Sequence, residues 1–99
     1  LAVVHHGGAG TTSAALRAGR PQVVVPHAFD QFQWARWVRS AGLGPEPIAR
    51  KRLSVERLTG ALSQVSSEPR FAERAEALMR AARKHDPVAG VLRVLSQVR

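Results

Sequence analysis

A glycine-rich turn that directly follows a short apolar segment places the tightest limit on how this chain folds. The apolar segment is Leu1–Val4, and residues 5–12 of the turn read HHGGAGTT. Such a segment is typical of a parallel strand that is buried on both faces. A helix is expected over residues 11–18, with Thr11 or Thr12 as its N-cap. The free backbone N–H groups and the positive end of that helix would point at one small volume, which suits a phosphate.

The strand–turn–helix order is repeated further along the chain. The β-branched run Val23–Val25 predicts a second buried strand, and Asp30 is placed to cap a helix over residues 31–41 that stops at Gly42. Residues 43–48 contain two prolines and are expected to form an edge strand or a loop. Strands that alternate with helices predict a parallel sheet, in which ligands bind at the carboxyl ends of the strands. Both turns would therefore face the same crevice.

Helices are expected in the rest of the chain, beginning at Ser54, Pro69 and Asp86. Trp34 and Trp37, three residues apart, are expected to pack in the core or at a domain interface. The apolar residues predicted to face inward are Val55, Leu58, Leu62 and Val65 in the first of these helices and Phe71, Ala75, Leu78 and Ala82 in the second. The predicted class is α/β, a parallel sheet followed by C-terminal helices. Because two or three strands make a poor sheet and the chain begins in mid-pattern, we take it to be a piece of a longer protein.

Composition narrows the class of protein. A chain of 99 residues holds at most one domain, and its lack of cysteine excludes disulfides and thiolate metal sites. No apolar run approaches the roughly 20 residues that span a bilayer, and no secretion signal is visible, so a cytoplasmic location is the default expectation.

The formal net charge of +8 could indicate an anionic partner such as nucleic acid. We favour dispersed, solvated basic residues, because Arg50–Arg52 is the one cluster and no aromatic residues interleave with it. The dominance of Arg over Lys, with abundant Ala, points weakly to a bacterial source.

Two pairs of side chains beside the turns are candidates for ligand binding. An imidazole next to helix N-terminal amides can donate a hydrogen bond to a phosphate oxygen. Side chains alternate at a strand end, so we assign His6 to the phosphate and expect His5 to bond to a neighbouring strand or loop. Asp30 and Gln31 offer acceptors and donors that match vicinal sugar hydroxyls, although Asp30 could serve as an N-cap alone.

Together these segments resemble the nucleotide-sugar-dependent glycosyltransferases of the GT-B type. The similarity is greatest to the family of plant natural-product, sterol, macrolide and glycopeptide glycosyltransferases, and within it to the sterol-type branch. It covers roughly the first two thirds of the chain. The segments that carry it are HHGGAGTT at 5–12, AGRP at 18–21, VPHAFDQ at 25–31, GLGPEPI at 42–48 and KRLS at 51–54. The resemblance implies that residues 1–99 are the second half of a Rossmann-like donor-binding domain. The N-terminal acceptor domain and the first half of the donor domain would then lie outside this chain.

The resemblance also implies a role for each candidate residue. His6 would contact the diphosphate of the donor, while the amides and hydroxyls of Gly8, Gly10, Thr11 and Thr12 would hold its oxygens. Asp30 and Gln31 would bind the sugar hydroxyls.

The implied reaction moves a sugar from a UDP- or dTDP-linked donor to a small hydrophobic acceptor, such as a sterol or polyketide, with inversion. No metal or cofactor is implied. The catalytic base would lie in the N-terminal domain, so no catalytic residue is assigned here and the chain alone is expected to be inactive. The alternatives are a non-catalytic phosphate- or nucleic-acid-binding module, a transferase for a lipid-linked acceptor, and a nucleotide-sugar epimerase.

Overall fold

The structure is a computed structural model that describes residues 1–85, in which two short parallel strands alternate with helices. The elements are β1 (Val3–His5), α1 (Ala9–Arg17), β2 (Gln22–Val24), α2 (Asp30–Ser40), the 3-10 helix η1 (Arg50–Arg52), α3 (Val55–Ser67) and α4 (Pro69–His85). The strands pair in parallel, with His5 opposite Val24. The predicted α/β class with C-terminal helices is confirmed. The helix predicted from Asp86 lies outside the described residues.

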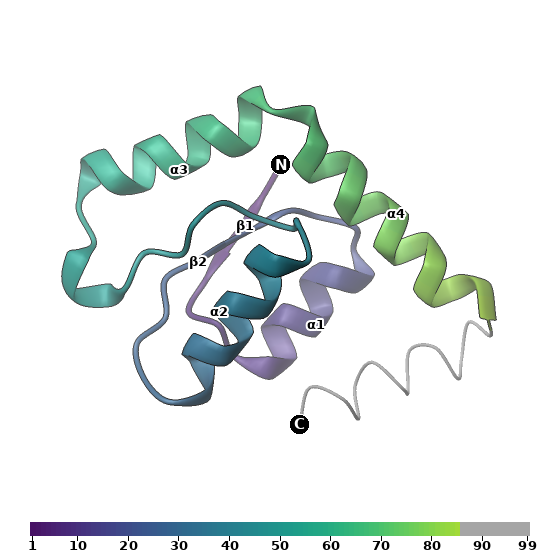
Figure 1. The fold of residues 1–99 in the computed structure, drawn as a ribbon, viewed down its shortest axis with the longest axis horizontal. Coiled ribbons are helices and arrows are strands. Elements are labelled where there is room, and N and C mark those ends of the chain that lie inside the picture. The colour runs from purple at the N-terminus through teal and green to yellow at the C-terminus, as the bar shows by residue number, and fades with distance from the viewer. Residues whose placement is uncertain (86–99) are drawn as a thin grey trace.

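Side-chain alternation along β2 divides the core into two layers. Val23 joins an apolar cluster with Ile48, Phe71 and the α3 residues Ala61 and Val65. Val24, on the other face of the strand, joins a cluster with Ala35 and Val38 of α2, Leu43 of the following loop and Ala75 of α4. Figure 1 shows the result, with α1 and α2 side by side and α3 passing along a different side of the strands.

The two strands differ in burial. All three residues of β2 are buried, as predicted, but the prediction of a fully buried first strand is wrong, because Val4 in β1 is 46% exposed. The reason is that both apolar clusters form around β2. The segment over residues 43–48 is a loop, yet it follows the other edge of β2: Gln22 N–H donates to Leu43 O at 2.8 Å and Ile48 N–H donates to Val24 O at 3.0 Å.

Both helices that follow the strands begin earlier than predicted. Helix α1 starts at Ala9 with Gly8 as its N-cap, so the assignment of the cap to Thr11 or Thr12 is wrong. The turn is completed at Gly7, whose φ of +95° reverses the chain before the threonines are reached. Helix α2 likewise takes Phe29 as N-cap and has Asp30 in its first turn, so Asp30 is not the cap.

The C-terminal helices begin where predicted; α4 buries Phe71 and Ala75 as predicted, whereas α3 buries less than predicted. The hydroxyl of Ser54 accepts the Arg57 N–H at 3.1 Å, and Pro69 is the first residue of α4. The predicted inward face of α3 is partly wrong, since Val55 is 82% exposed and Leu62 is 36% exposed. Only the stripe of Leu58, Ala61 and Val65 reaches the sheet.

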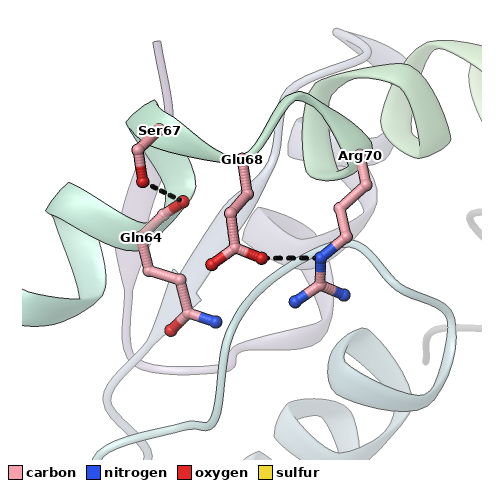
Figure 2. A network of polar contacts seen from close by, with 4 residues as sticks. All are labelled: Gln64, Ser67, Glu68 and Arg70. Carbon is pink, nitrogen blue, oxygen red and sulfur yellow. Dashed lines mark hydrogen bonds and ion pairs between the residues drawn. The ribbon is translucent and has the colours of Figure 1, made fainter.

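Polar contacts define the corner between α3 and α4 (Figure 2). The Ser67 hydroxyl donates to the Gln64 carbonyl at 3.4 Å, and Arg70 pairs with Glu68 at 2.8 Å. The Arg70 guanidinium also lies 4.2 Å from the centre of the buried Phe71 ring. These contacts lie beside Phe71, the residue through which the start of α4 enters the core.

The tryptophans do not join either apolar cluster within the described residues. Trp34 and Trp37 meet edge to face, with ring centroids 6.3 Å apart, and Trp37 is 39% exposed. The prediction of core packing is therefore wrong for this pair, because the inward face of α2 is occupied by the smaller Ala35 and Val38, and the alternative of a domain interface stays a prediction. Over residues 1–85, no helix is long and apolar enough to cross a membrane.

Candidate functional site

The start of α1 presents a group of hydrogen-bond donors that the fold does not use. The first backbone bond of the helix runs from Thr12 N–H to Gly8 O at 2.9 Å, which leaves the N–H groups of Ala9, Gly10 and Thr11 without a partner inside the helix. No side chain of residues 1–85 caps this end, and no acidic residue lies in the first turn of the helix. Space is open at Gly10, where an added Cβ would meet no atom within 4 Å. The helix start therefore suits an anionic ligand.

The structure places His6 beside these donors. His6 is exposed, and its Nε2 lies 3.3 Å from the position that a Cβ on Gly8 would take. Its ring also lies near that of His27, with centroids 5.9 Å apart and the ring planes tilted by 59°. The imidazole is thus close to the residue that caps α1, as the phosphate-binding role would require.

His5 has a structural role, and the prediction that it bonds to a neighbouring strand is confirmed. Its Nε2 donates to Gln22 Oε1 at 2.7 Å, and its Nδ1 accepts the Gly7 N–H at 2.9 Å. Gln22 is fully buried and donates in turn to the Thr12 carbonyl at 3.4 Å. These bonds require a neutral imidazole with its proton on Nε2. Burial is the main cause that lowers the pKa of His5 below its ordinary value, and the nearby His6 lowers it further, against the opposing effect of the Gln22 bond.

The two threonines of the turn lie in different surroundings. Thr11 is exposed at the helix start. Thr12 is 1% exposed, and its hydroxyl donates back to Gly8 O at 2.8 Å. A ligand at the surface would therefore meet the hydroxyl of Thr11 first.

The turn after β2 has its hydrogen-bonding groups largely engaged. Gln31 N–H donates to Ala28 O at 3.1 Å, which closes a tight turn, and Phe29 has φ 51° and ψ −126°. These angles match the first central position of a type II′ turn, which glycine normally occupies. The Gln31 Oε1 accepts the N–H of His27 at 2.8 Å and that of Ala28 at 3.2 Å. Asp30 is exposed, and its carboxylate makes no hydrogen bond or ion pair with another residue of the described range.

The structure brings the two turns into direct contact. An added Cβ on the buried Gly7 would lie 2.8 Å from the Gln31 carbonyl oxygen and 3.3 Å from its Cα. The start of α2 therefore packs against the glycine turn, and the candidate sugar residues lie next to the candidate diphosphate residues. No group of three or more His, Cys, Asp or Glu in the described part of the chain could hold a metal ion.

Sequence reasoning missed a hollow beside these turns. It has a volume of about 380 Å³ and is lined by His27, Phe32 and the three residues Ala49–Lys51. The basic cluster at residues 50–52 was visible in the sequence, but its position was not. The backbone bond from Arg50 N–H to Pro26 O, at 3.1 Å, is what brings it to the end of β2.

Comparison with known proteins agrees with the family that the sequence motifs resemble. The model of the family "Erythromycin biosynthesis protein CIII-like, C-terminal domain" matches residues 1–95. A sterol 3-beta-glucosyltransferase of Arabidopsis thaliana is 40% identical over 92 residues, which are 93% of this chain and 14% of that protein. A sterol 3-beta-glucosyltransferase of Komagataella phaffii is 36% identical over 96 residues, or 97% of this chain and 8% of that protein. The O-mycaminosyltylonolide 6-deoxyallosyltransferase of Streptomyces fradiae is 43% identical over 77 residues, or 78% of this chain and 18% of that protein. The chain thus spans less than a fifth of the length of each of these relatives.

Proposed function

The chain belongs to the erythromycin biosynthesis protein CIII-like C-terminal domains of GT-B glycosyltransferases, and on that premise we propose that it binds the diphosphate and sugar of a nucleoside diphosphate sugar. The relatives are named as glucosyltransferases and a deoxyallosyltransferase, all of which transfer a hexose. The proposed role is therefore the donor half-site of a hexosyltransferase.

One observation carries the proposal, namely the free N–H groups at the start of α1 with His6 beside them. Negative charge builds on the nucleoside diphosphate as its bond to the sugar breaks. Donors fixed in advance, together with the positive end of a helix, stabilise that charge. His6 adds a hydrogen bond when neutral and a charge-assisted one when protonated.

The sugar would be held by the second turn. The Asp30 carboxylate accepts hydrogen bonds from hydroxyls, and the Gln31 side-chain NH₂ donates one, because the Gln31 Oε1 is already engaged by His27 and Ala28. We propose direct displacement with inversion. The acceptor oxygen bonds to the anomeric carbon, the bond to the diphosphate breaks, and the acceptor proton passes to a base outside this chain. The donor would be UDP- or dTDP-linked and the acceptor a hydrophobic molecule such as a sterol or polyketide.

The pairing and exposure of β1 support the proposal that this strand belongs to a larger sheet. Within the described residues β1 pairs with β2 alone, and the apolar Val4 is 46% exposed. We propose that further strands of a longer donor domain pair with this edge, and that an N-terminal domain supplies the acceptor site and the base. A cytoplasmic location stays a prediction.

A titration followed by backbone NMR tests the donor half-site. With UDP and UDP-glucose, we expect saturable shifts of Gly8 to Thr12, and with UDP-glucose additional shifts of Asp30 and Gln31. Uridine, which lacks phosphate, should leave the glycine turn unshifted. His6→Ala should weaken UDP binding roughly ten-fold, the loss typical of one charge-assisted hydrogen bond.

Arg20→Ala serves as the matched control, because it removes one exposed positive charge beyond the opposite end of α1. It should change the affinity for UDP less than two-fold. The proposal fails if UDP shifts no residue of the glycine turn either in this folded chain or in a longer protein that includes the upstream strands.

A further inference from the structure

The hollow lined by His27, Phe32 and Ala49–Lys51, called here the basic hollow, is assembled from three separate parts of the chain. Backbone bonds hold these parts in place. Arg50 N–H donates to Pro26 O at 3.1 Å, which fixes η1 against the turn after β2, and Phe32 N–H donates to Phe29 O at 3.1 Å at the start of α2. Backbone hydrogen bonds therefore fix the position of the segments whose side chains line the hollow.

The charges around the basic hollow come from Arg50 and Lys51. These two residues line it together with His27, and no acidic residue within residues 1–85 does. The ion pairs within residues 1–85 join Arg39 to Glu46, Arg70 to Glu68 and Arg80 to Glu76, so neither Arg50 nor Lys51 is neutralised in this part of the chain. An anion that enters the hollow would meet two cations, and no carboxylate of the described residues lines the hollow to compete with it.

A second hollow differs from the basic hollow in the signs of the charges that line it. It has a volume of about 320 Å³ and is also lined by two arginines, Arg52 and Arg57, but it includes the carboxylate of Glu46. An anion there would face repulsion from Glu46, which already pairs with Arg39. The charge pattern of the basic hollow therefore distinguishes it from the neighbouring one.

The position of the basic hollow links it to the donor site. The His27 ring lies near that of His6, with centroids 5.9 Å apart, and the His27 N–H donates to Gln31 Oε1 at 2.8 Å. A ligand held by His6 and Gln31 would thus have its sugar end, or the acceptor that meets it, beside the basic hollow.

We infer that the basic hollow binds an anionic group, a carboxylate above all, carried on a ring of the donor sugar or of the acceptor. An arginine guanidinium pairs with a carboxylate through two parallel hydrogen bonds, and Lys51 adds a point charge. Phe32, which is 37% exposed, gives the hollow an apolar wall against which a ring can lie. The volume is within the range of small-molecule sites. The inference rests on the proposed donor site for the identity of the reaction, but not for the binding of the anion.

Two matched pairs of probes test the inference and separate the two sources of the anion. UDP-glucuronate against UDP-glucose tests an acidic donor sugar, and cholate against its neutral amide tests an acidic, apolar acceptor. Calorimetric titration of the chain should show the acidic member of one pair binding about ten-fold more tightly than its neutral counterpart. The pair that shows the preference identifies which substrate carries the acid.

Two charge-matched variants assign that preference to the basic hollow. Arg50→Gln with Lys51→Gln should abolish the preference for the acidic probe. Arg52→Gln with Arg57→Gln removes the same charge from the neighbouring hollow and should leave the preference within two-fold of its original value. NMR spectra of both variants check that the fold is retained.

The outcomes separate failure of this inference from failure of the proposed function. Equal affinity for both members of both pairs, or equal loss in the two double variants, overturns the inference. If UDP-glucose leaves the glycine turn unshifted both in this chain and in a longer protein that includes the upstream strands, the donor site fails, while the cholate pair still tests the basic hollow.

Discussion

The turns after β1 and β2 occupy equivalent places in the fold but use their hydrogen-bonding groups in opposite ways. The turn after β1 places its positive φ at a glycine, Gly7, and leaves the N–H groups at the start of α1 open. The turn after β2 places a positive φ at Phe29 and uses the Gln31 oxygen to hold its own backbone. The first turn thus leaves donors available for an anion. The second turn uses its groups to hold a strained backbone, and the Asp30 carboxylate and the Gln31 NH₂ group remain available for hydroxyl groups.

The largest expected effect comes from Gly7→Ala, which breaks the contact between the two turns. The new Cβ would lie 2.8 Å from the Gln31 carbonyl oxygen, and alanine is strained at a φ of +95°. We expect a loss of about 4 kcal/mol in the free energy of unfolding, measured by urea denaturation, from strain and overpacking together. Gly10→Ala is the control, since its Cβ meets open space and alanine favours the helix by up to about 1 kcal/mol. A similar small change in both variants would contradict the close contact of the turns.

The next effect separates the two functions assigned to Gln31. Gln31→Ala removes the acceptor of the His27 and Ala28 N–H groups and should cost about 1–2 kcal/mol of stability. Gln31→Glu keeps an acceptor oxygen and adds a favourable negative charge at a helix start, so it should retain most of the stability. Because it lacks the NH₂ donor, it should still weaken the binding of UDP-glucose relative to UDP. If Gln31→Glu is as unstable as Gln31→Ala, the oxygen is not what holds this turn.

A gain in stability is expected from Phe29→Gly. Glycine adopts the φ of 51° and ψ of −126° without strain, whereas a large side chain pays about 1–3 kcal/mol in such regions. Phe29 is 91% exposed, so its removal loses little burial. After the entropy cost of glycine is subtracted, thermal or urea unfolding should show a gain of about 1 kcal/mol. Phe29→Ala keeps the strain and should show no gain. A gain of equal size in both variants would mean that the exposed ring, not the backbone, limits stability.

The two turns also show what the sequence could and could not predict. The glycine and proline positions and the apolar runs predicted the order of the elements, because these signals are local. The N-caps were misplaced at both turns, because each turn is completed before the residue with the best capping side chain, at Gly7 four residues before Thr11 and at Phe29 one residue before Asp30. The exposure of Val4 and the position of the basic cluster beside His27 depend on which segments pack around β2, and no local pattern encodes that. The roles of the proposed site residues stay predictions.

The smallest effect is a pH dependence of stability that belongs to the first turn. In the folded chain His5 accepts the Gly7 N–H, and burial lowers its pKa below the ordinary 6.5. The unfolded chain therefore binds more protons than the folded chain once the pH falls below about 6.5, so stability is complete above that pH and is lost as the pH drops toward the folded pKa. Urea denaturation between about pH 5 and 7.5 should show this decline, and His5→Gln, which does not titrate, should flatten it. His6→Gln should leave most of the decline in place, because burial, not His6, is the main cause of the lowered pKa of His5. Parallel curves for the original chain and His5→Gln would show that the hydrogen bonds of His5 do not depend on its neutral form, and that the first turn is held by its glycines alone.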